Sequence, residues 1–136
     1  MTWEPRPVPI VTPETTPFWS GAAAGELLLN RCESCDLTYY YPRSHCPDCL
    51  SDDVTWIEAS GAGEVYSYTV TDVVEGWPDA ELPLVSAYVE LEEGPRMLSV
   101  IVECDPDQVT VGMSVNVRFV PTEDEDIAIP VFEPTG

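Results

Sequence analysis

The chain has 136 residues, enough for one ordinary domain or for two very small domains that share an interface. Its hydrophobic content of 44% excludes a wholly disordered chain, and its apolar runs are far shorter than the roughly 18 residues that a membrane-spanning helix requires. Twenty-five acidic residues against five arginines and no lysine give a net charge of −20, which argues against nucleic-acid binding because phosphate contacts need clustered basic side chains.

The acidic residues are scattered along the chain rather than gathered in one tail. A carboxylate-rich surface without lysine is typical of proteins from salt-accumulating halophiles, where a Debye length of about 3 Å near 1 M salt screens the repulsion. The alternative is an acidic protein that binds basic partners. The N-terminus lacks the basic region and apolar core of a secretory signal, so we expect a cytoplasmic protein with no membrane partner.

Residues 1–25 are expected to form an extended, proline-rich arm and one short helix. Thr16 is the predicted N-cap and Pro17 the first helical residue, and Gly25 closes the alanine-rich segment. Phe18 and Trp19 lie in the first turn. A helix this short is unstable alone in water, so its aromatic side chains must pack on the rest of the molecule or on a partner.

Residues 26–60 are predicted to form a ribbon. Strands at 26–31 and 37–41 would make a hairpin around a first pair of cysteines. A second pair lies in a turn-rich loop, and residues 54–58 supply a third strand. Glycines at 61 and 63 break this pattern, which places the boundary between two modules there.

Residues 61–136 are predicted to form a second, β-rich module, with strands at 64–71, 84–91, 97–103, 114–120 and 128–132. In the first strand Tyr66, Tyr68 and Val70 alternate with polar residues, which places them on one face. Five short strands fit a small barrel of the OB type better than a sandwich of about seven. The predicted fold class is mainly β, with a short N-terminal helix, a rubredoxin-like zinc ribbon and a five-stranded OB-fold barrel.

Four cysteines, Cys32, Cys35, Cys46 and Cys49, form two CxxC pairs with ten residues between them. In a chain outside the secretory pathway this pattern predicts a tetrathiolate metal site rather than disulfides. Two CxxC turns present four sulfurs in the tetrahedral shell that Zn²⁺ prefers, and a closed shell leaves no position for water or substrate. We therefore expect one structural Zn²⁺.

Iron is the alternative metal, because rubredoxins also use four thiolates. Rubredoxin-like turns commonly carry glycine just after the second cysteine, where the backbone adopts positive φ, whereas this chain has Asp36 and Leu50 there. That difference favours zinc. Because four cysteines complete the shell, His45 is expected at the surface, and Cys104 is expected to be an inert, small apolar side chain.

A run of ordered motifs covers nearly the whole chain: Pro17-Phe18-Trp19, Gly25-Glu26-Leu27, Arg31-Cys32-x-x-Cys35, Tyr41-Pro42-Arg43, Cys46-Pro47-x-Cys49, Gly63 to Thr69, Val111 to Val115 and Pro130-Val131-Phe132. This pattern resembles the zinc-ribbon plus OB-fold proteins associated with thiolases. The resemblance implies a non-catalytic partner of a thiolase-like or HMG-CoA-synthase-like enzyme, with a role in acyl-CoA binding. The missing glycines after both CxxC pairs depart from the pattern and affect turn detail rather than the ligands.

The residues themselves also argue against an independent active site. No Ser-His-Asp set can be assembled around the single histidine, no Gly-rich phosphate loop follows a strand, and the paired thiols are assigned to metal. What remains is an aromatic, arginine-containing surface of the kind that protein interfaces use, expected from residues 39–43 with Trp19, Trp56 and Trp77. The expected ligand- or partner-binding residues are Phe18, Trp19, Tyr39, Tyr41, Arg43, Tyr66 and Tyr68.

Alternatives remain open at this point. The tyrosines at 39–41 could simply alternate between core and solvent, and Arg43 or Arg31 could pair with a CoA phosphate or with one of the many carboxylates of the chain. Zinc ribbons and OB barrels also occur in nucleic-acid-binding proteins, although the charge argues against that function here. A rubredoxin-like electron carrier remains possible only if the metal is iron.

Overall fold

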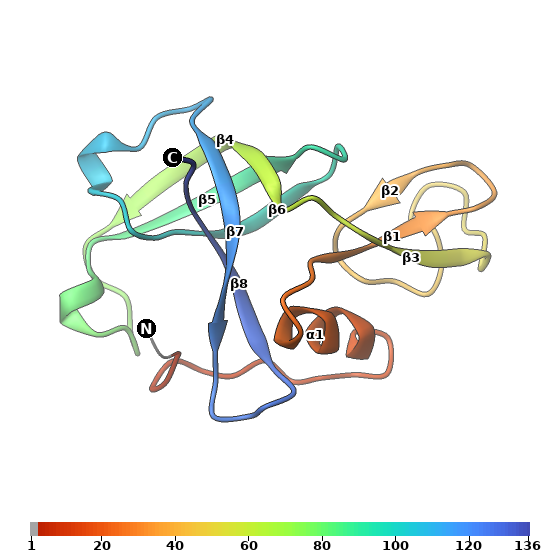
Figure 1. Ribbon diagram of the computed structural model, residues 1–136, viewed down its shortest axis with the longest axis horizontal. Helices are drawn as coiled ribbons and strands as arrows, with labels where there is room; N and C mark the ends of the chain where they lie inside the picture. Colours follow the sequence, from red (N-terminus) through yellow and green to blue (C-terminus); the bar gives the residue numbers. More distant parts are fainter. Residues whose placement is uncertain (1–2) are drawn as a thin grey trace.

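The computed structural model describes residues 3–136 and shows a small three-stranded sheet beside a closed barrel (Figure 1). The elements in chain order are α1 (Thr16–Ala23), β1 (Leu28–Cys32), β2 (Thr38–Tyr39), β3 (Val54–Glu58), β4 (Ala62–Thr71), η1 (Asp79–Glu81), β5 (Leu84–Leu91), β6 (Arg96–Ile101), η2 (Pro106–Gln108), β7 (Ser114–Pro121) and β8 (Ala128–Pro134). Within the described residues, no helix has the length and apolar character needed to cross a membrane.

The predicted ribbon is present as an antiparallel sheet in the order β2-β1-β3. Strand β1 pairs with β3 over its whole length, from Leu28 opposite Glu58 to Cys32 opposite Val54. Strand β2 is only two residues long, shorter than the predicted 37–41, because the chain turns away after Tyr39 toward the second cysteine pair.

The predicted five-stranded barrel is confirmed, with the closed order β4-β5-β6-β8-β7. Four of its seams are antiparallel and carry most of the ladder hydrogen bonds. The fifth seam, between β6 and β8, is parallel and contains one register pair, Ile101 opposite Phe132. Side chains inside the barrel fill it, as expected for a small barrel.

The predicted alternation in β4 is interrupted by a β-bulge between Val65 and Ser67. Beyond the bulge Ser67 lies opposite Tyr88, and Tyr68 lies opposite the buried Ala87. Because directly opposed residues point to the same side of a sheet, Tyr68 lies on the same side of the strand as Ala87, although Tyr68 is 36% exposed. The expectation that Tyr66 and Tyr68 share one face is therefore wrong, since the extra residue of the bulge changes the phase of the alternation.

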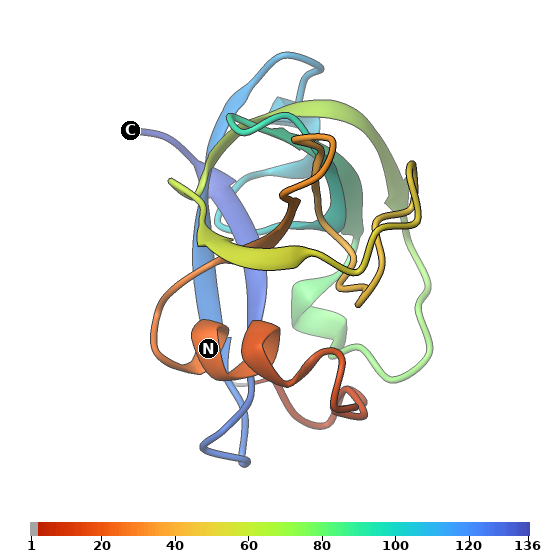
Figure 2. The same ribbon diagram turned by 90° about the vertical axis from the view of Figure 1, so that its right-hand side faces the viewer.

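One hydrophobic cluster joins the helix, the ribbon and the barrel. Phe18 from α1, Leu27 and Leu29 beside and within β1, and Ala59 after β3 are buried together with barrel residues such as Phe132. Figure 2 shows the ribbon in front of the barrel with α1 on the same side. The short helix, which would be unstable alone in water, is thus stabilised by packing against β1, β7 and β8.

The helix begins one residue earlier than predicted, with Thr15 rather than Thr16 at the N-cap. The Thr15 side chain makes no cap bond within the helix. Its Oγ1 instead accepts a hydrogen bond from the Thr12 N–H at 3.0 Å, which closes the turn that precedes the helix.

The N-terminal arm is attached to the barrel by a buried arginine. The Arg6 guanidinium lies 4.6 Å from the ring centroids of both Trp3 and Trp77 and donates to the Glu81 carboxylate at 2.7 Å. Arg6 is only 2% exposed. Burial strengthens both the cation–π contacts and the ion pair, so the arm is held against the β4–β5 connection.

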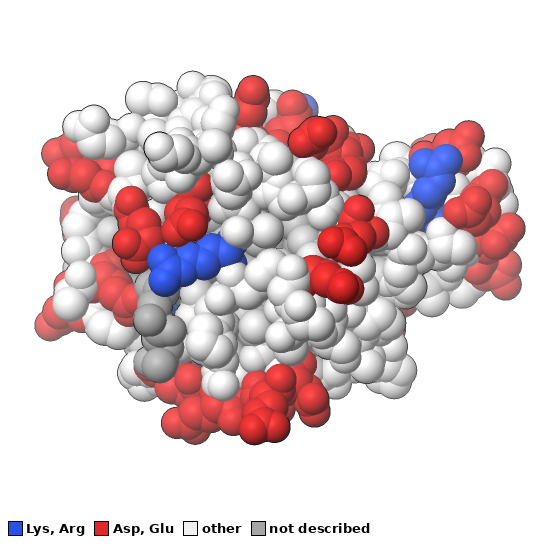
Figure 3. Space-filling model, viewed as in Figure 1, with Lys and Arg blue, Asp and Glu red and all other residues white. Residues whose placement is uncertain are grey.

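Acidic side chains are scattered over the visible face of both modules and far outnumber the basic ones there (Figure 3). The turn at 123–126 is wholly acidic and exposed. Such a surface repels itself, and the repulsion destabilises the compact state in dilute buffer.

We expect the melting temperature to rise by several degrees as KCl increases from about 0.1 M to about 2 M, because the Debye length shrinks from about 10 Å to under about 3 Å. The variant Glu123→Gln/Glu125→Gln should show a smaller rise. Sucrose, which stabilises by exclusion without screening, should stabilise both proteins equally. A wild-type melting temperature that ignores molar KCl would contradict the halophile interpretation.

Candidate metal centre and partner surface

Each CxxC pair forms a turn of the same backbone geometry. The Asp36 N–H donates to the Cys32 carbonyl and the Leu50 N–H to the Cys46 carbonyl, both at 2.9 Å. The residue after the second cysteine has positive φ in both turns, 66° at Asp36 and 65° at Leu50. This is the conformation that favours glycine, and Asp tolerates it better than Leu.

The two turns bring four sulfur atoms together. Their Sγ atoms all lie within 4.8 Å of one another. The Cys32 and Cys49 sulfurs are 3.5 Å apart, and those of Cys35 and Cys46 are 3.6 Å apart. These separations far exceed a disulfide bond of about 2.05 Å. They are close to the edge of about 3.8 Å in a tetrahedron with metal–sulfur bonds of about 2.3 Å, so the donor set fits zinc.

Backbone N–H groups favour a thiolate at Cys46. The Cys49 N–H lies 3.5 Å from the Cys46 sulfur and lowers the pKa of this thiol to about 7, with a further contribution from the Asp48 N–H at 3.4 Å. Burial opposes this shift. A metal requires the thiolate form, so these donors prepare the ligand in advance.

Neither His45 nor Cys104 belongs to this cluster. His45 is exposed, and its Nδ1 lies 3.2 Å from the Ser44 hydroxyl. Cys104 is half-buried at the far end of the barrel, where its thiol donates to the Asp105 carbonyl.

Family comparisons agree with this geometry. A model described as the ChsH2 rubredoxin-like zinc ribbon domain matches residues 19–55, and one described as the ChsH2 C-terminal OB-fold domain matches residues 56–120. A solved structure titled "Ltp2-ChsH2(DUF35) aldolase" superposes with a TM-score of 0.81 at 34% identity, over 93% of this chain and 98% of that one. The chain belongs to the DUF35 family.

Two curated relatives of the chain carry different names. A "DUF35 domain-containing scaffold protein" of Methanocaldococcus jannaschii is 39% identical over 90 residues, which are 65% of this chain and 64% of that protein. A "Probable enoyl-CoA hydratase alpha subunit" of Thermomonospora curvata is 35% identical over 95% of this chain. The DUF35 chain spans only 40% of that subunit's length.

The structure places the seven predicted partner-binding residues at different depths. Phe18 and Tyr39 are buried, and the Tyr39 hydroxyl donates to the Arg43 carbonyl. These two side chains therefore lie beneath the surface of the isolated chain. Trp19 is half-buried, and Tyr41 and Arg43 are exposed.

Aromatic rings connect the helix to the ribbon. Phe18 contacts Trp19 at 4.9 Å and Tyr40 at 5.9 Å between ring centroids, and Tyr40 contacts Tyr41 at 6.0 Å, all edge to face. Edge-to-face pairs fix the relative orientation of the rings. Trp19, Tyr40 and Tyr41 thus form a rigid aromatic edge, of which Tyr41 is 57% exposed.

An apolar groove of about 210 Å³ continues from this edge onto the barrel, between β6 and β8. The groove follows from the weak β6–β8 seam. Pro130 has no backbone N–H to donate across it, and the Ser99 hydroxyl bonds the Pro130 carbonyl at 2.9 Å instead. Leu98 lines the groove and is 55% exposed.

Two barrel residues, Tyr88 and Leu98, extend this surface and were missed by sequence reasoning. Leu98 lies opposite Tyr88 in the β5–β6 ladder, and both point outward. The Arg96 guanidinium lies 3.7 Å from the ring centroid of Tyr66, which places Tyr66 on the same outer face. The exposure of these apolar side chains could have been predicted only from the pairing register of β5 and β6, which the sequence does not show. We call Trp19, Tyr40, Tyr41, Tyr66, Tyr88 and Leu98 the aromatic surface.

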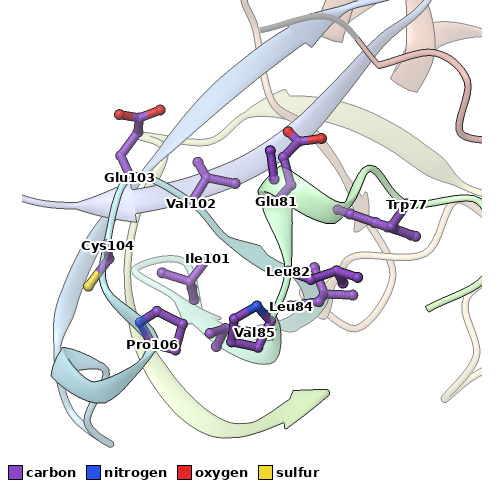
Figure 4. Close-up of a pocket in the computed structure, with 12 residues that line it drawn as sticks. Trp77, Glu81, Leu82, Leu84, Val85, Ile101, Val102, Glu103, Cys104 and Pro106 are labelled. Atoms are coloured by element: carbon purple, nitrogen blue, oxygen red, sulfur yellow. The ribbon is translucent and has the colours of Figure 1, made fainter. Parts of the chain in front are cut away.

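A larger cavity, of about 460 Å³, lies at the other end of the barrel (Figure 4). Leu82, Val85 and Ile101 form its apolar floor, and Glu81 and Glu103 lie at its rim. Both rim carboxylates form ion pairs with arginines. None of the predicted binding residues lies there, and Trp77, which the sequence suggested as an interface residue, is half-buried over Arg6.

Loss of one cysteine ligand should abolish metal binding. We expect wild-type protein to hold one metal ion per chain, and Cys46→Ser to lose most of it and melt at a lower temperature, because the metal-binding free energy is also folding free energy. Elemental analysis and thermal unfolding measure the two effects. Cys104→Ser is the matched control, and equal metal content in both variants would contradict the assignment.

Leu50→Gly should stabilise the protein by about 1 kcal/mol, because glycine removes the left-handed strain at this exposed position. Thermal unfolding of the metal-loaded protein measures the change. Asp52→Gly, in the same loop but without positive φ, should be neutral or slightly destabilising. Equal effects of the two substitutions would count against strain at Leu50.

Proposed function

We propose that this DUF35 chain is a non-catalytic scaffold subunit that binds a thiolase-superfamily enzyme, with one structural Zn²⁺ in the ribbon. The superposition on the structure titled "Ltp2-ChsH2(DUF35) aldolase", over almost all of both chains, carries the proposal. Relatives named scaffold proteins support a non-catalytic role. A metal held by Cys32, Cys35, Cys46 and Cys49 would supply folding energy rather than chemistry, because its shell is complete.

The aromatic surface is the proposed docking site. It joins the ribbon, the helix and the barrel into one face, and the rings beneath it hold it rigid. Interfaces are enriched in tyrosine, tryptophan and arginine, and a rigid face loses little entropy on binding. Its exposed apolar side chains contrast with the acidic surface elsewhere.

We further propose that the groove between β6 and β8 contributes to acyl-CoA binding when the partner is in place. Its lining of Trp19, Leu98 and Val131 suits an apolar arm such as pantetheine. The groove is small and open on this chain alone, so the enzyme would supply the rest of the site. The nucleic-acid alternative receives no support from the basic residues, since four of the five arginines pair with carboxylates.

Purification of the tagged chain from its source cells, followed by mass spectrometry, tests the partner class. A thiolase-superfamily subunit in stoichiometric amount is the expected result. Calorimetry of the reconstituted complex with coenzyme A and acetyl-CoA then tests the ligand role. Recovery of RNA alone would favour the nucleic-acid-binding alternative. Recovery of an oxidoreductase together with a coloured, iron-containing sample would favour the electron carrier.

Leu98→Asp should weaken the reconstituted complex at least about tenfold, because it places a charge in the centre of an apolar contact. Val111→Asp is the matched control, since Val111 is similarly exposed but lies on the loop before β7, outside the groove. Both variants should melt close to wild type. Equal affinities of the two variants would remove the groove from the interface.

A further inference from the structure

Arg43 differs from the other arginines in having no carboxylate within ion-pair distance, although the charge of Glu14 lies near enough to interact with it. The other four form ion pairs at 2.7 to 3.2 Å: Arg6 with Glu81, Arg31 with Asp36, Arg96 with Glu90 and Arg118 with Glu103. Across residues 3–136, no carboxylate lies within ion-pair distance of Arg43 and its guanidinium donates no hydrogen bond. In a chain of net charge −20, an exposed arginine without an ion pair is unexpected.

The backbone of Arg43 is nonetheless held firmly in place. The buried Asn30 accepts a hydrogen bond from its N–H at 3.1 Å, and the Tyr39 hydroxyl donates to its carbonyl at 2.7 Å. The Glu14 carboxylate accepts from the next N–H, that of Ser44, at 2.7 Å. Side chains from the arm, β1 and β2 thus fix one exposed loop. The Ser44 N–H is the main cause of the lowered pKa of the Glu14 carboxyl, and the charge of Arg43 lowers this pKa further without a direct ion pair.

The Arg43 side chain is also oriented. Its guanidinium lies 5.6 Å from the centroid of the exposed Tyr41 ring. A cation–π contact of this kind restricts the plane of the guanidinium and leaves its N–H groups available at the edge.

We propose that Arg43, together with Tyr41, is a preorganised anchor for a carboxylate side chain on the partner enzyme. This inference rests on the proposed scaffold function and names the chemistry of one contact within it. A guanidinium accepts a carboxylate in a bidentate geometry, and the fixed loop removes most of the ordering cost. Tyr41 contacts Tyr40, so the anchor lies at the end of the aromatic surface and sets the register of docking.

A carboxylate fits this place better than the phosphates of coenzyme A. One hollow beside Arg43, of about 320 Å³, is also lined by Glu14 and Asp52 and by no second basic residue. A second, of about 440 Å³, again includes Glu14 and adds His45 as its only other basic side chain. Those acids would repel a ligand with several negative charges, whereas a single carboxylate matches the single guanidinium. The other arginine of the ribbon, Arg31, is engaged by Asp36.

The test uses the complex of the full chain with the thiolase-superfamily enzyme identified as its partner. Arg43→Gln should raise the Kd at least about tenfold, and Arg43→Lys, which keeps the charge but loses the fork, should raise it less. Arg31→Gln is the matched control on the same ribbon and should bind within about twofold of wild type. Replacing the facing partner carboxylate by lysine should rescue Arg43→Glu.

Thermal unfolding should show that Arg43→Gln is as stable as wild type, because the side chain is exposed. If wild type and Arg43→Gln bind the enzyme with equal affinity, the role of Arg43 as an anchor is contradicted while the scaffold function stands. If wild type does not hold the enzyme, the proposed function itself fails. If Arg43→Gln lowers the affinity for coenzyme A but not for the enzyme, the guanidinium serves phosphate and the inference is overturned.

Discussion

The continuous hydrophobic cluster is the constraint on which the molecule depends. Three short strands cannot bury a core of their own, and β2 is only two residues long. Leu27, Leu29 and Ala59 solve this problem by packing with barrel residues, while the four sulfurs hold the outer end of the ribbon. The ribbon is thus fixed at both ends, by apolar contacts at its base and by the cysteine cluster at its tip. A surface that crosses from one module to the other can then keep a constant shape.

The CxxC turns and most of the strands could be predicted from residues that are close in sequence. The cysteine spacing specified two turns and their convergence, and the glycine and proline punctuation specified the strands. Strands β3 and β5 match the predicted bounds, and the other strands differ at one or both ends. These features depend on residues close in sequence, where backbone preferences and hydrophobic period act directly. Asp36 and Leu50 adopt the positive φ of rubredoxin-like turns without glycine, so the missing glycines do not separate zinc from iron.

What the sequence could not specify depends on pairing between distant strands. The bulge in β4 moves Tyr66 and Tyr68 to opposite faces, and nothing local to that strand announces it. The exposure of Tyr88 and Leu98 follows from a register that only the closed barrel defines. Arg6 and Trp77 lie far apart in sequence, so their stacking could not be anticipated, and Trp77 resembled an interface residue. The depth of Phe18 and Tyr39 likewise depends on tertiary packing.

The seam between β6 and β8 is the part of the barrel where local opening is easiest. Closed barrels resist deformation because every strand is laddered on both sides. Here one joint depends on a single register pair, the Val102 N–H bond to the Phe132 carbonyl at 2.8 Å, the Ser99 hydroxyl and the buried ring of Phe132. Few backbone bonds must break for β6 to separate slightly from β8, so local opening should cost least at this place. The wall of the groove is therefore its compliant side, able to widen around an inserted chain while the rest of the barrel stays rigid.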